Sequence, residues 1–365
     1  MLDLRVAALS AVVLAAIVSA GCRTSVPPPF ATVVVDDPFE VAPAGPLSAQ
    51  APGSDRRQQS DIAFPAEWVN TWVPFENWGK LNGLQPARLA GVNPHPTYEL
   101  QTTNGPLAIK IGSRAAQFDG LNWWLGFAPQ MIRGAPCLHW LDAKNNLQPL
   151  LAVPNANFAA NRTIVIDPGH GGTDSGARSV FNGAFEKDYT LDWAIRLSWL
   201  LASNGFNVIL TRDRDIEVSL QQRVAMAERA NASVFISLHF NSGASNRELS
   251  GIETYCLTPS GMPSSLVREY EDDVTQVFPN NAFDEQNLHL ALRLHRSLVQ
   301  NTSAVDRGIR RARFMGVLRG QNRPAVLIEG GYLSNPQEAR RLADESYRGR
   351  LAGAVAAALM PVAMQ

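Results

Sequence analysis

The fold of the second half of this 365-residue chain can be argued outward from Thr163-Ile164-Val165-Ile166-Asp167-Pro168-Gly169-His170-Gly171-Gly172-Thr173-Asp174-Ser175-Gly176-Ala177. The β-favouring residues at 163–166 predict a buried strand, and Pro168-Gly169 ends it. Open α/β sheets build their sites where strands stop at polar, glycine-rich loops. We therefore expect His170 to be the first ligand of a metal site at this strand end.

Strands and helices alternate through residues 161–365. Apolar runs predict strands at 163–167, 208–210, 233–238, 252–256, 314–318 and 325–328. Apolar residues at helical spacing predict helices at 187–203, 220–230 and 288–299, and two more helices close the chain. This order predicts a doubly wound α/β domain, with a mostly parallel sheet and helices on both faces.

A different pattern precedes this domain. Two hairpins are expected around Asn104-Gly105 and Asp119-Gly120, and a short helix at 74–84. Together they predict a small α+β accessory domain at 61–150. It resembles the copper-amine-oxidase N-terminal-type domains of bacterial envelope proteins in its hairpin order, its Ile111-Gly112-Ser113 turn and its aromatic run. Its aromatic side chains could stack on glycans, but we interpret most of them as core.

The first 22 residues carry a targeting signal. Val6–Ala20 is an uncharged run of 15 residues, which is shorter than the roughly 20 needed to span a bilayer and fits a signal-peptide core. Ser19-Ala20-Gly21 before Cys22 resembles a bacterial lipoprotein signal, in which cleavage leaves a lipidated cysteine. It departs from that pattern at Ser19, where an aliphatic residue is usual, and a plain secretory signal is the alternative. Seven prolines at 23–60 predict a disordered tether.

Overall composition narrows the class of protein. The net charge is −1, so no basic field points to a nucleic-acid partner. Hydrophobic residues make up 45% of the chain, which is ordinary for a globular protein. The three cysteines do not imply a disulfide framework, and we expect Cys137 and Cys256 to be unpaired.

Four acidic or imidazole side chains stand where a parallel sheet would bring them together. His170, His239 and Glu329 follow strand ends, and Glu186 opens the first long helix. Two imidazoles and one carboxylate are a typical protein shell for a catalytic zinc, which leaves a fourth position for water. Each residue alone has a simpler explanation, such as a hydrogen-bonded histidine or a first-turn glutamate. The remaining histidines lack a spaced partner and are interpreted as structural.

The domain resembles the zinc-dependent N-acetylmuramoyl-L-alanine amidases that cleave bacterial peptidoglycan. The resemblance covers about half the chain and does not extend to residues 23–150. The matching segments are Ile166–Gly172 with Asp174 and Gly176-Ala177, Glu186-Lys187, Thr211-Arg212, Ser237–Ser242, Gly251–Tyr255, Asp306–Ile309, Ala312–Phe314, and Val326–Glu329 with Leu333–Pro336.

This resemblance implies a role for each residue of the constellation. His170, Glu186 and His239 would bind one zinc ion, and Glu329 would take a proton from the attacking water and later give it to the leaving amine. The bond cut would join the lactyl group of N-acetylmuramic acid to L-alanine of the stem peptide. Asp167 precedes the turn, so we expect it to orient His170 or its loop as a residue behind the ligands.

Two alternatives remain open at this stage: a non-catalytic wall-binding lipoprotein with the same fold, and a zinc peptidase that cuts within the stem peptide. Some family members insert a long inhibitory helix that an activator displaces. The prolines and glycine of 257–286 favour a surface loop here, with at most a short helix at 264–277. Peptidoglycan is the expected substrate, and a protein activator is a further candidate partner. The signal predicts export to the cell envelope and a lipid anchor facing the periplasm.

Overall fold

The computed structural model describes residues 64–92, 95–152, 161–266 and 272–360. The signal at 1–22 with Cys22, and the tether at 23–60, lie outside the described residues. Within the described part, no helix combines the length and apolar character needed to cross a membrane.

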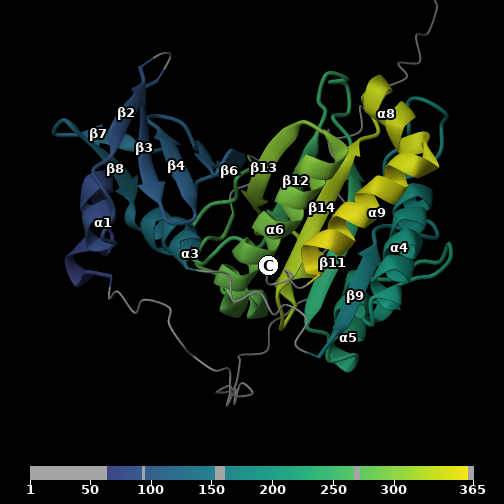
Figure 1. Ribbon diagram of the computed structural model, residues 1–365. Helices are drawn as coiled ribbons and strands as arrows, with labels where there is room; N and C mark the ends of the chain where they lie inside the picture. The colour runs from purple at the N-terminus through teal and green to yellow at the C-terminus, as the bar shows by residue number, and fades with distance from the viewer. Residues whose placement is uncertain (1–63, 93–94, 153–160, 267–271, 361–365) are drawn as a thin grey trace, which may run out of the picture.

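A mixed, largely parallel sheet forms the centre of the second half of the chain (Figure 1). Its strands are β9 (Thr163–Pro168), β10 (Asn207–Leu210), β11 (Val234–Asn241), β12 (Ile252–Cys256), β13 (Asp306–Arg311) and β14 (Ala325–Tyr332). The parallel strands lie in the order β10-β9-β11-β14, then β12 pairs antiparallel with β14 and β13 pairs parallel with β12. The predicted α/β class is confirmed.

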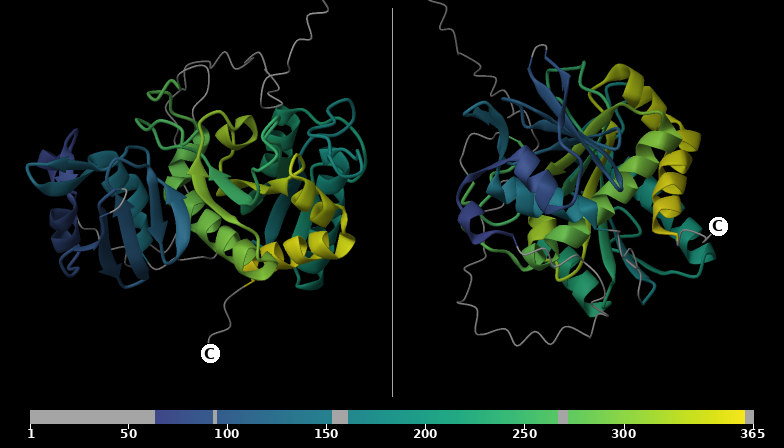
Figure 2. Two further views of the ribbon diagram at one scale, coloured as in Figure 1. Left: turned by 90° about the horizontal axis from the view of Figure 1, so that it is seen from above. Right: turned by 60° about the vertical axis from the view of Figure 1, so that its left-hand side comes forward.

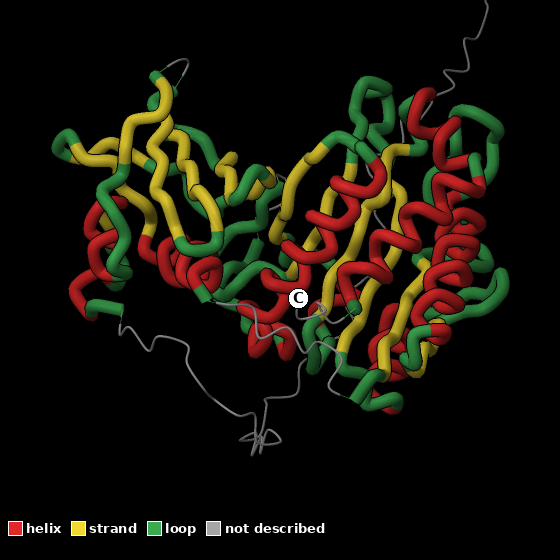
Figure 3. Tube along the Cα trace, in the orientation of Figure 1, coloured by secondary structure: helices red, strands yellow, loops and turns green. Residues whose placement is uncertain are grey.

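Helices cover both faces of this sheet (Figure 3). They are α4 (Glu186–Ser203), α5 (Leu220–Arg229), α6 (Asp284–Thr302), α7 (Gly316–Arg319), α8 (Pro336–Ala343) and α9 (Glu345–Leu359), with a 3-10 turn at Pro279–Phe283. Successive side chains of a strand point to opposite faces. Accordingly Ile164 and Ile166 pack in the core under α4, α6 and α9, whereas Val165 packs in a second core with α5 and α7.

The N-terminal region contains antiparallel strands that belong to two sheets, with short helices. Its elements are a 3-10 turn at Ala66–Trp68, β1 (Trp72–Pro74), α1 (Phe75–Leu81), β2 (Arg88–Gly91), β3 (Thr97–Thr102), β4 (Gly105–Lys110), β5 (Ala115–Phe118), β6 (Leu121–Trp124), β7 (Gln130–Ile132), β8 (Ala135–His139), α2 (Trp140–Asp142), a π turn at Ala143–Leu147 and α3 (Gln148–Leu151). Both predicted hairpins form, as β3-β4 and β5-β6. Trp123 is 1% exposed and belongs to the core, as expected.

The two halves share one sheet. Strand β6 pairs in parallel with β13 through Ile309 and Trp123, so the order continues β13-β6-β5-β4-β3-β2. The backbone N–H of Asn122 also donates to Asp306 Oδ2 at 2.7 Å. The left view of Figure 2 shows the N-terminal sheet meeting the second half of the chain edge to edge. Cys137 and Cys256 are both free, as expected.

One detail differs from the sequence-based expectations, and a second agrees with the surface loop expected at 257–286. Residues 314–318 form no strand; they contain a turn and the start of α7, and the strand of this region is β13, just before them, which lies between β12 and β6. The described parts of 264–277 contain no helix, and residues 267–271 lie outside the described residues. The sequence of β13, Asp-Arg-Gly-Ile-Arg-Arg, does not look like a buried strand, because it has four charged residues. Two of them, Arg310 and Arg311, are nevertheless buried through ionic and hydrogen-bonded contacts with other parts of the fold.

Candidate metal centre

His170 stands in the loop that follows β9. Its φ is 63°, a left-handed backbone conformation that few non-glycine residues adopt. Such strain persists only where surrounding structure holds it, and it is common at functional sites. Two contacts hold the residue: Asp174 Oδ2 lies 2.8 Å from ring Nδ1, and Arg223 Nη2 donates to the His170 carbonyl at 2.8 Å. The Nε2 atom is thereby directed toward Glu186.

Glu186 is the first residue of α4, where the positive end of the helix dipole favours a carboxylate. The residue is 4% exposed. Its Oε2 accepts from the N–H of Ala177 at 2.9 Å, and its Oε1 accepts from the N–H of Phe240 at 3.0 Å. These backbone donors fix the carboxylate between the loop after β9 and strand β11.

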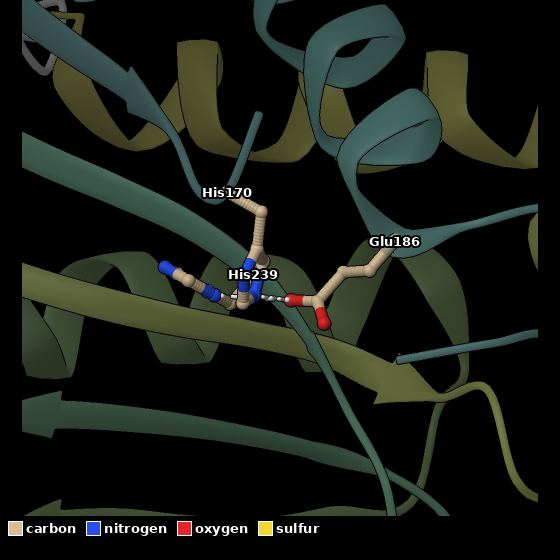
Figure 4. A group of neighbouring side chains, drawn as sticks. All are labelled: His170, Glu186 and His239. Carbon is tan, nitrogen blue, oxygen red and sulfur yellow. Dashed lines mark hydrogen bonds and ion pairs between the residues drawn. The ribbon is translucent and has the colours of Figure 1, made fainter. Parts of the chain in front are cut away.

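His239 comes from β11 and completes the group (Figure 4). Glu186 Oε1 lies 3.0 Å from His170 Nε2 and 3.0 Å from His239 Nδ1. One candidate ligand atom from each of the three residues lies within 4.8 Å of the others. The structure therefore brings together the three residues that the sequence proposed as metal ligands.

Electrostatics favour a cation at this point. Although burial opposes the shift, the neighbouring His170 and His239 rings hold the pKa of Glu186 below its ordinary range. For His170, burial lowers the pKa, but the nearby carboxylates of Glu186 and Asp174 outweigh burial and raise the pKa to about 10. A metal ion bound there would compete with protons for these ligand atoms.

Two glycines make room for the cluster. A Cβ at Gly169 would lie 2.2 Å from His239 Cε1, and one at Gly176 would lie 2.6 Å from Glu186 Oε2. Distances this short exclude a side chain at either position. His and Glu side chains are common zinc ligands, and the two glycines leave space beside them. The residues present therefore fit a resident metal ion.

Two aspartates near the cluster, Asp167 and Asp174, make different contacts. Asp167 is buried and accepts from Thr211 Oγ1 and Arg223 Nη1, each at 2.5 Å, and from Ser237 Oγ at 2.7 Å. It therefore reaches the loop through Arg223, which also donates to the His170 carbonyl. The direct contact to the His170 ring comes from Asp174, a residue present in the quoted motif but not singled out from sequence. We propose that Asp167 positions the loop and Asp174 orients the ligand.

Glu329 lies on β14 opposite His239, in the register of the parallel β11-β14 pair. Its Oε2 is buried and has no hydrogen-bond partner among the described residues. Burial, then the charges of Glu186 and Glu253, raise the pKa of its carboxyl well above the ordinary value. A buried, unpaired carboxyl beside a candidate metal site is a candidate proton acceptor.

Sequence reasoning missed Glu253 on β12. It is 2% exposed and stands opposite Glu329 in the antiparallel β12-β14 pair. Its Oε2 accepts from Tyr255 Oη at 2.7 Å and from Asn241 Nδ2 at 3.1 Å, and its Oε1 lies 2.9 Å from Arg307 Nε. The signal was present, because a glutamate inside a buried strand needs partners.

A His–Glu–His cluster with a free carboxyl, set at the strand ends of a largely parallel α/β sheet, is the arrangement expected of a metal-dependent hydrolase. The model of the family described as N-acetylmuramoyl-L-alanine amidase matches residues 164–360, more than half of the chain. The chain therefore belongs to the N-acetylmuramoyl-L-alanine amidase family.

The chain is also similar to individual proteins over this region. The chain is 30% identical over 218 residues to amidase AmiA of Escherichia coli (strain K12), covering 53% of this chain and 74% of AmiA. It is 33% identical over 199 residues to amidase LytC of Bacillus subtilis (strain 168), covering 54% of this chain and 35% of LytC, so it spans about a third of that protein. Among solved structures, the catalytic domain of the amidase CwlV from Bacillus (Paenibacillus) polymyxa var. colistinus is 34% identical, with a TM-score of 0.45, covering 54% of this chain and 94% of that one.

Proposed function

We propose that this peptidoglycan amidase uses one zinc ion, held by His170, Glu186 and His239, to hydrolyse the amide between the N-acetylmuramic acid lactyl group and L-alanine of the stem peptide. The observation that carries the proposal is the cluster itself, whose candidate ligand atoms lie within 4.8 Å of one another. Zinc bound there would supply Lewis-acid polarisation of the scissile carbonyl. Family membership supports the choice of bond.

Glu329 is the proton-transfer residue of this proposal. Its position opposite His239 places it beside the metal centre, and its raised pKa fits a group that must both accept and release a proton. It takes a proton from the attacking water, then gives it to the nitrogen of the departing alanine. Hydrogen bonds from backbone donors to Glu186 keep that second carboxylate in place as a ligand rather than a base.

The Glu329→Gln variant tests these separate roles. It removes the proton acceptor but leaves His170, Glu186 and His239 untouched, so it should bind one zinc ion per chain while losing at least about 100-fold in peptide release from sacculi. Zinc is measured by elemental analysis and release by free amino termini. Near-normal turnover in this variant would remove Glu329 from the mechanism, and loss of zinc would make Glu329 a ligand.

We further propose that residues 61–150 form an accessory unit and that residues 161–365 form the catalytic one. The chain would be exported to the cell envelope and anchored through a lipid on Cys22. This anchor would place the catalytic unit on the same side of the membrane as peptidoglycan. Radiolabelled fatty acid should enter the wild-type protein but not the Cys22→Ala variant, and equal labelling of both would contradict the anchor.

A further inference from the structure

One face of the sheet carries a polar row that begins at the metal centre and crosses onto the N-terminal region. Residues directly opposite in neighbouring strands project from the same face. His239 is opposite Glu329, and Glu329 is opposite Glu253. On the next strands Tyr255, two residues after Glu253, is opposite Arg310.

Trp124 continues this row on β6. The β13-β6 pair places Ile309 opposite Trp123, so the following residues, Arg310 and Trp124, also share a face. The guanidinium carbon of Arg310 lies 4.2 Å from the centre of the Trp124 ring, within the range of a cation–π contact. The row thus leads from the candidate zinc ligands to the strand that joins the two halves of the chain.

A cavity of about 290 Å³ lies where β13 and β6 meet. Its walls include Ala115, Asn122, Trp124, Asp306, Arg307 and Arg310. The N-terminal sheet provides the first three of these residues and the catalytic half provides the others. The cavity therefore depends on the pairing of β13 with β6.

The positive charge on the cavity wall is only partly compensated. Arg307 Nε and Arg310 Nε approach the same oxygen, Oε1 of Glu253, at 2.9 and 3.0 Å. The Arg310 side chain is 7% exposed, and its Nε is not aligned for a hydrogen bond with that oxygen or with any other described residue. Two guanidinium groups that share one carboxylate leave positive charge for a further anion.

Asp306 is the other acid on the wall, and its carboxylate is already engaged. Its Oδ2 accepts from the backbone N–H of Asn122 at 2.7 Å, and its Oδ1 lies 2.9 Å from His295 Nε2. The contacts of Asp306 thus hold the junction of the two sheets together. They do not reach the guanidinium groups of Arg307 or Arg310 in the described structure.

The spacing of the sheet suits a peptide. Neighbouring strands lie about 4.8 Å apart, so the junction of β13 and β6 is about 14 to 19 Å across the sheet from β11. An extended peptide covers about 3.4 Å per residue, so four to five residues span that distance. A stem peptide with its first amide at the metal centre would bring later residues to the cavity.

We propose that this cavity binds a free carboxylate of the substrate's stem peptide through Arg310 and Arg307, with Trp124 as an apolar wall. The proposal rests on the proposed amidase function. It makes the N-terminal region part of the substrate-binding surface, and it makes the enzyme selective for stem peptides whose carboxylates are not amidated.

Calorimetric titration of the purified full chain tests this binding without turnover. The probes are a synthetic stem tetrapeptide with free carboxylates and the same peptide with every carboxylate converted to an amide. The free acid should bind about tenfold more tightly, the change expected for one well-placed charge pair. Equal affinity for the two peptides would overturn the proposal.

Variants at Ala115, on β5 opposite Trp124, locate the site. Ala115→Glu should weaken binding of the free acid about tenfold relative to Ala115→Gln, which adds the same bulk without charge. Gln101→Glu, at the exposed position of β3, adds that charge to the same sheet away from the cavity and should leave affinity unchanged. Equal affinities for Ala115→Glu and Ala115→Gln would place the peptide elsewhere.

The outcomes for the cavity and for the proposed function are separable. If the wild-type chain binds the free acid as described but releases no peptide from sacculi, the cavity stands and the proposed function fails. If it releases peptide but binds both peptides equally, the function stands and the cavity assignment fails.

Discussion

At the scale of single residues, the centre depends on backbone conformation as much as on ligand chemistry. His170 adopts a left-handed φ of 63°, and Gly169 must lack a side chain because His239 occupies that space. The three ligands could be predicted from sequence because they stand at strand ends or open a helix. Asp174 could not be singled out, because its contact with the His170 ring depends on how the loop turns.

Replacement of Asp174 by Asn should weaken zinc binding. The carboxylate lies 2.8 Å from Nδ1 of His170 and supports the ligand with its charge, and loss of such support typically costs 10 to 100-fold in metal affinity. A chelator competition titration measures the effect. Asp213→Asn, which alters an exposed acid beside Arg214, is the control. Unchanged affinity in Asp174→Asn would show that the contact does not support the ligand.

At the scale of elements, predictions succeeded where hydrophobic patterns are strong and failed where buried charge replaces them. The apolar runs of β9, β11 and β14 were located correctly. Strand β13 was missed because it carries three arginines, and the apolar run after it was wrongly taken for a strand. Arg311 shows why β13 is stable: its Nε donates to Asn146 Oδ1 at 2.9 Å and its Nη1 to the Leu257 carbonyl at 3.1 Å.

The short helix α2 should give the protein a measurable pH dependence through Asp142. Burial raises the pKa of this fully buried carboxyl to about 6 from an ordinary value of 3.8, although hydrogen bonds from Gly126, Asn146 and Phe127 oppose the shift. The folded protein therefore binds this proton more tightly than the unfolded chain does. The stabilisation is complete below pH 3.8 and is lost as the pH rises through about 6.

Denaturant unfolding of wild type and Asp142→Asn between pH 4 and 7 measures this linkage. The variant is less stable at every pH, because one backbone N–H loses its acceptor. The free-energy advantage of the wild type should shrink by up to about 3 kcal/mol as the pH rises. If the wild type's free-energy advantage instead grew with pH, the hydrogen-bond donors would outweigh burial and the pKa of Asp142 would be lowered rather than raised.

At the scale of the whole molecule, the N-terminal region and the catalytic half share one hydrophobic core and are joined by polar contacts and one short strand pair. Arg311 Nη2 donates to the Asn145 carbonyl at 3.1 Å, and Arg114 Nη2 donates to the Ser264 carbonyl at 2.8 Å. This junction could not be predicted, because one register pair and scattered side-chain bonds leave no periodic pattern in the sequence.

The two halves should therefore unfold together. We expect one calorimetric transition for the whole chain. Arg311→Met should lose about 2 to 4 kcal/mol of unfolding free energy, because buried acceptors lose their donor, and its transition midpoint should fall accordingly. Arg214→Met changes an exposed arginine and should leave the midpoint unchanged. Two separated transitions, or an unchanged midpoint in Arg311→Met, would show that the junction does not couple the halves.

Mass spectrometry of the products released from purified sacculi tests the central claim most directly. The wild-type chain with zinc should release stem peptides that begin with a free L-alanine amino terminus, and a chelator should abolish the release until zinc is restored. Products cut within the stem peptide, or no zinc-dependent release at all, would contradict the assignment of His170, Glu186 and His239 as the metal centre of an amidase acting on this bond.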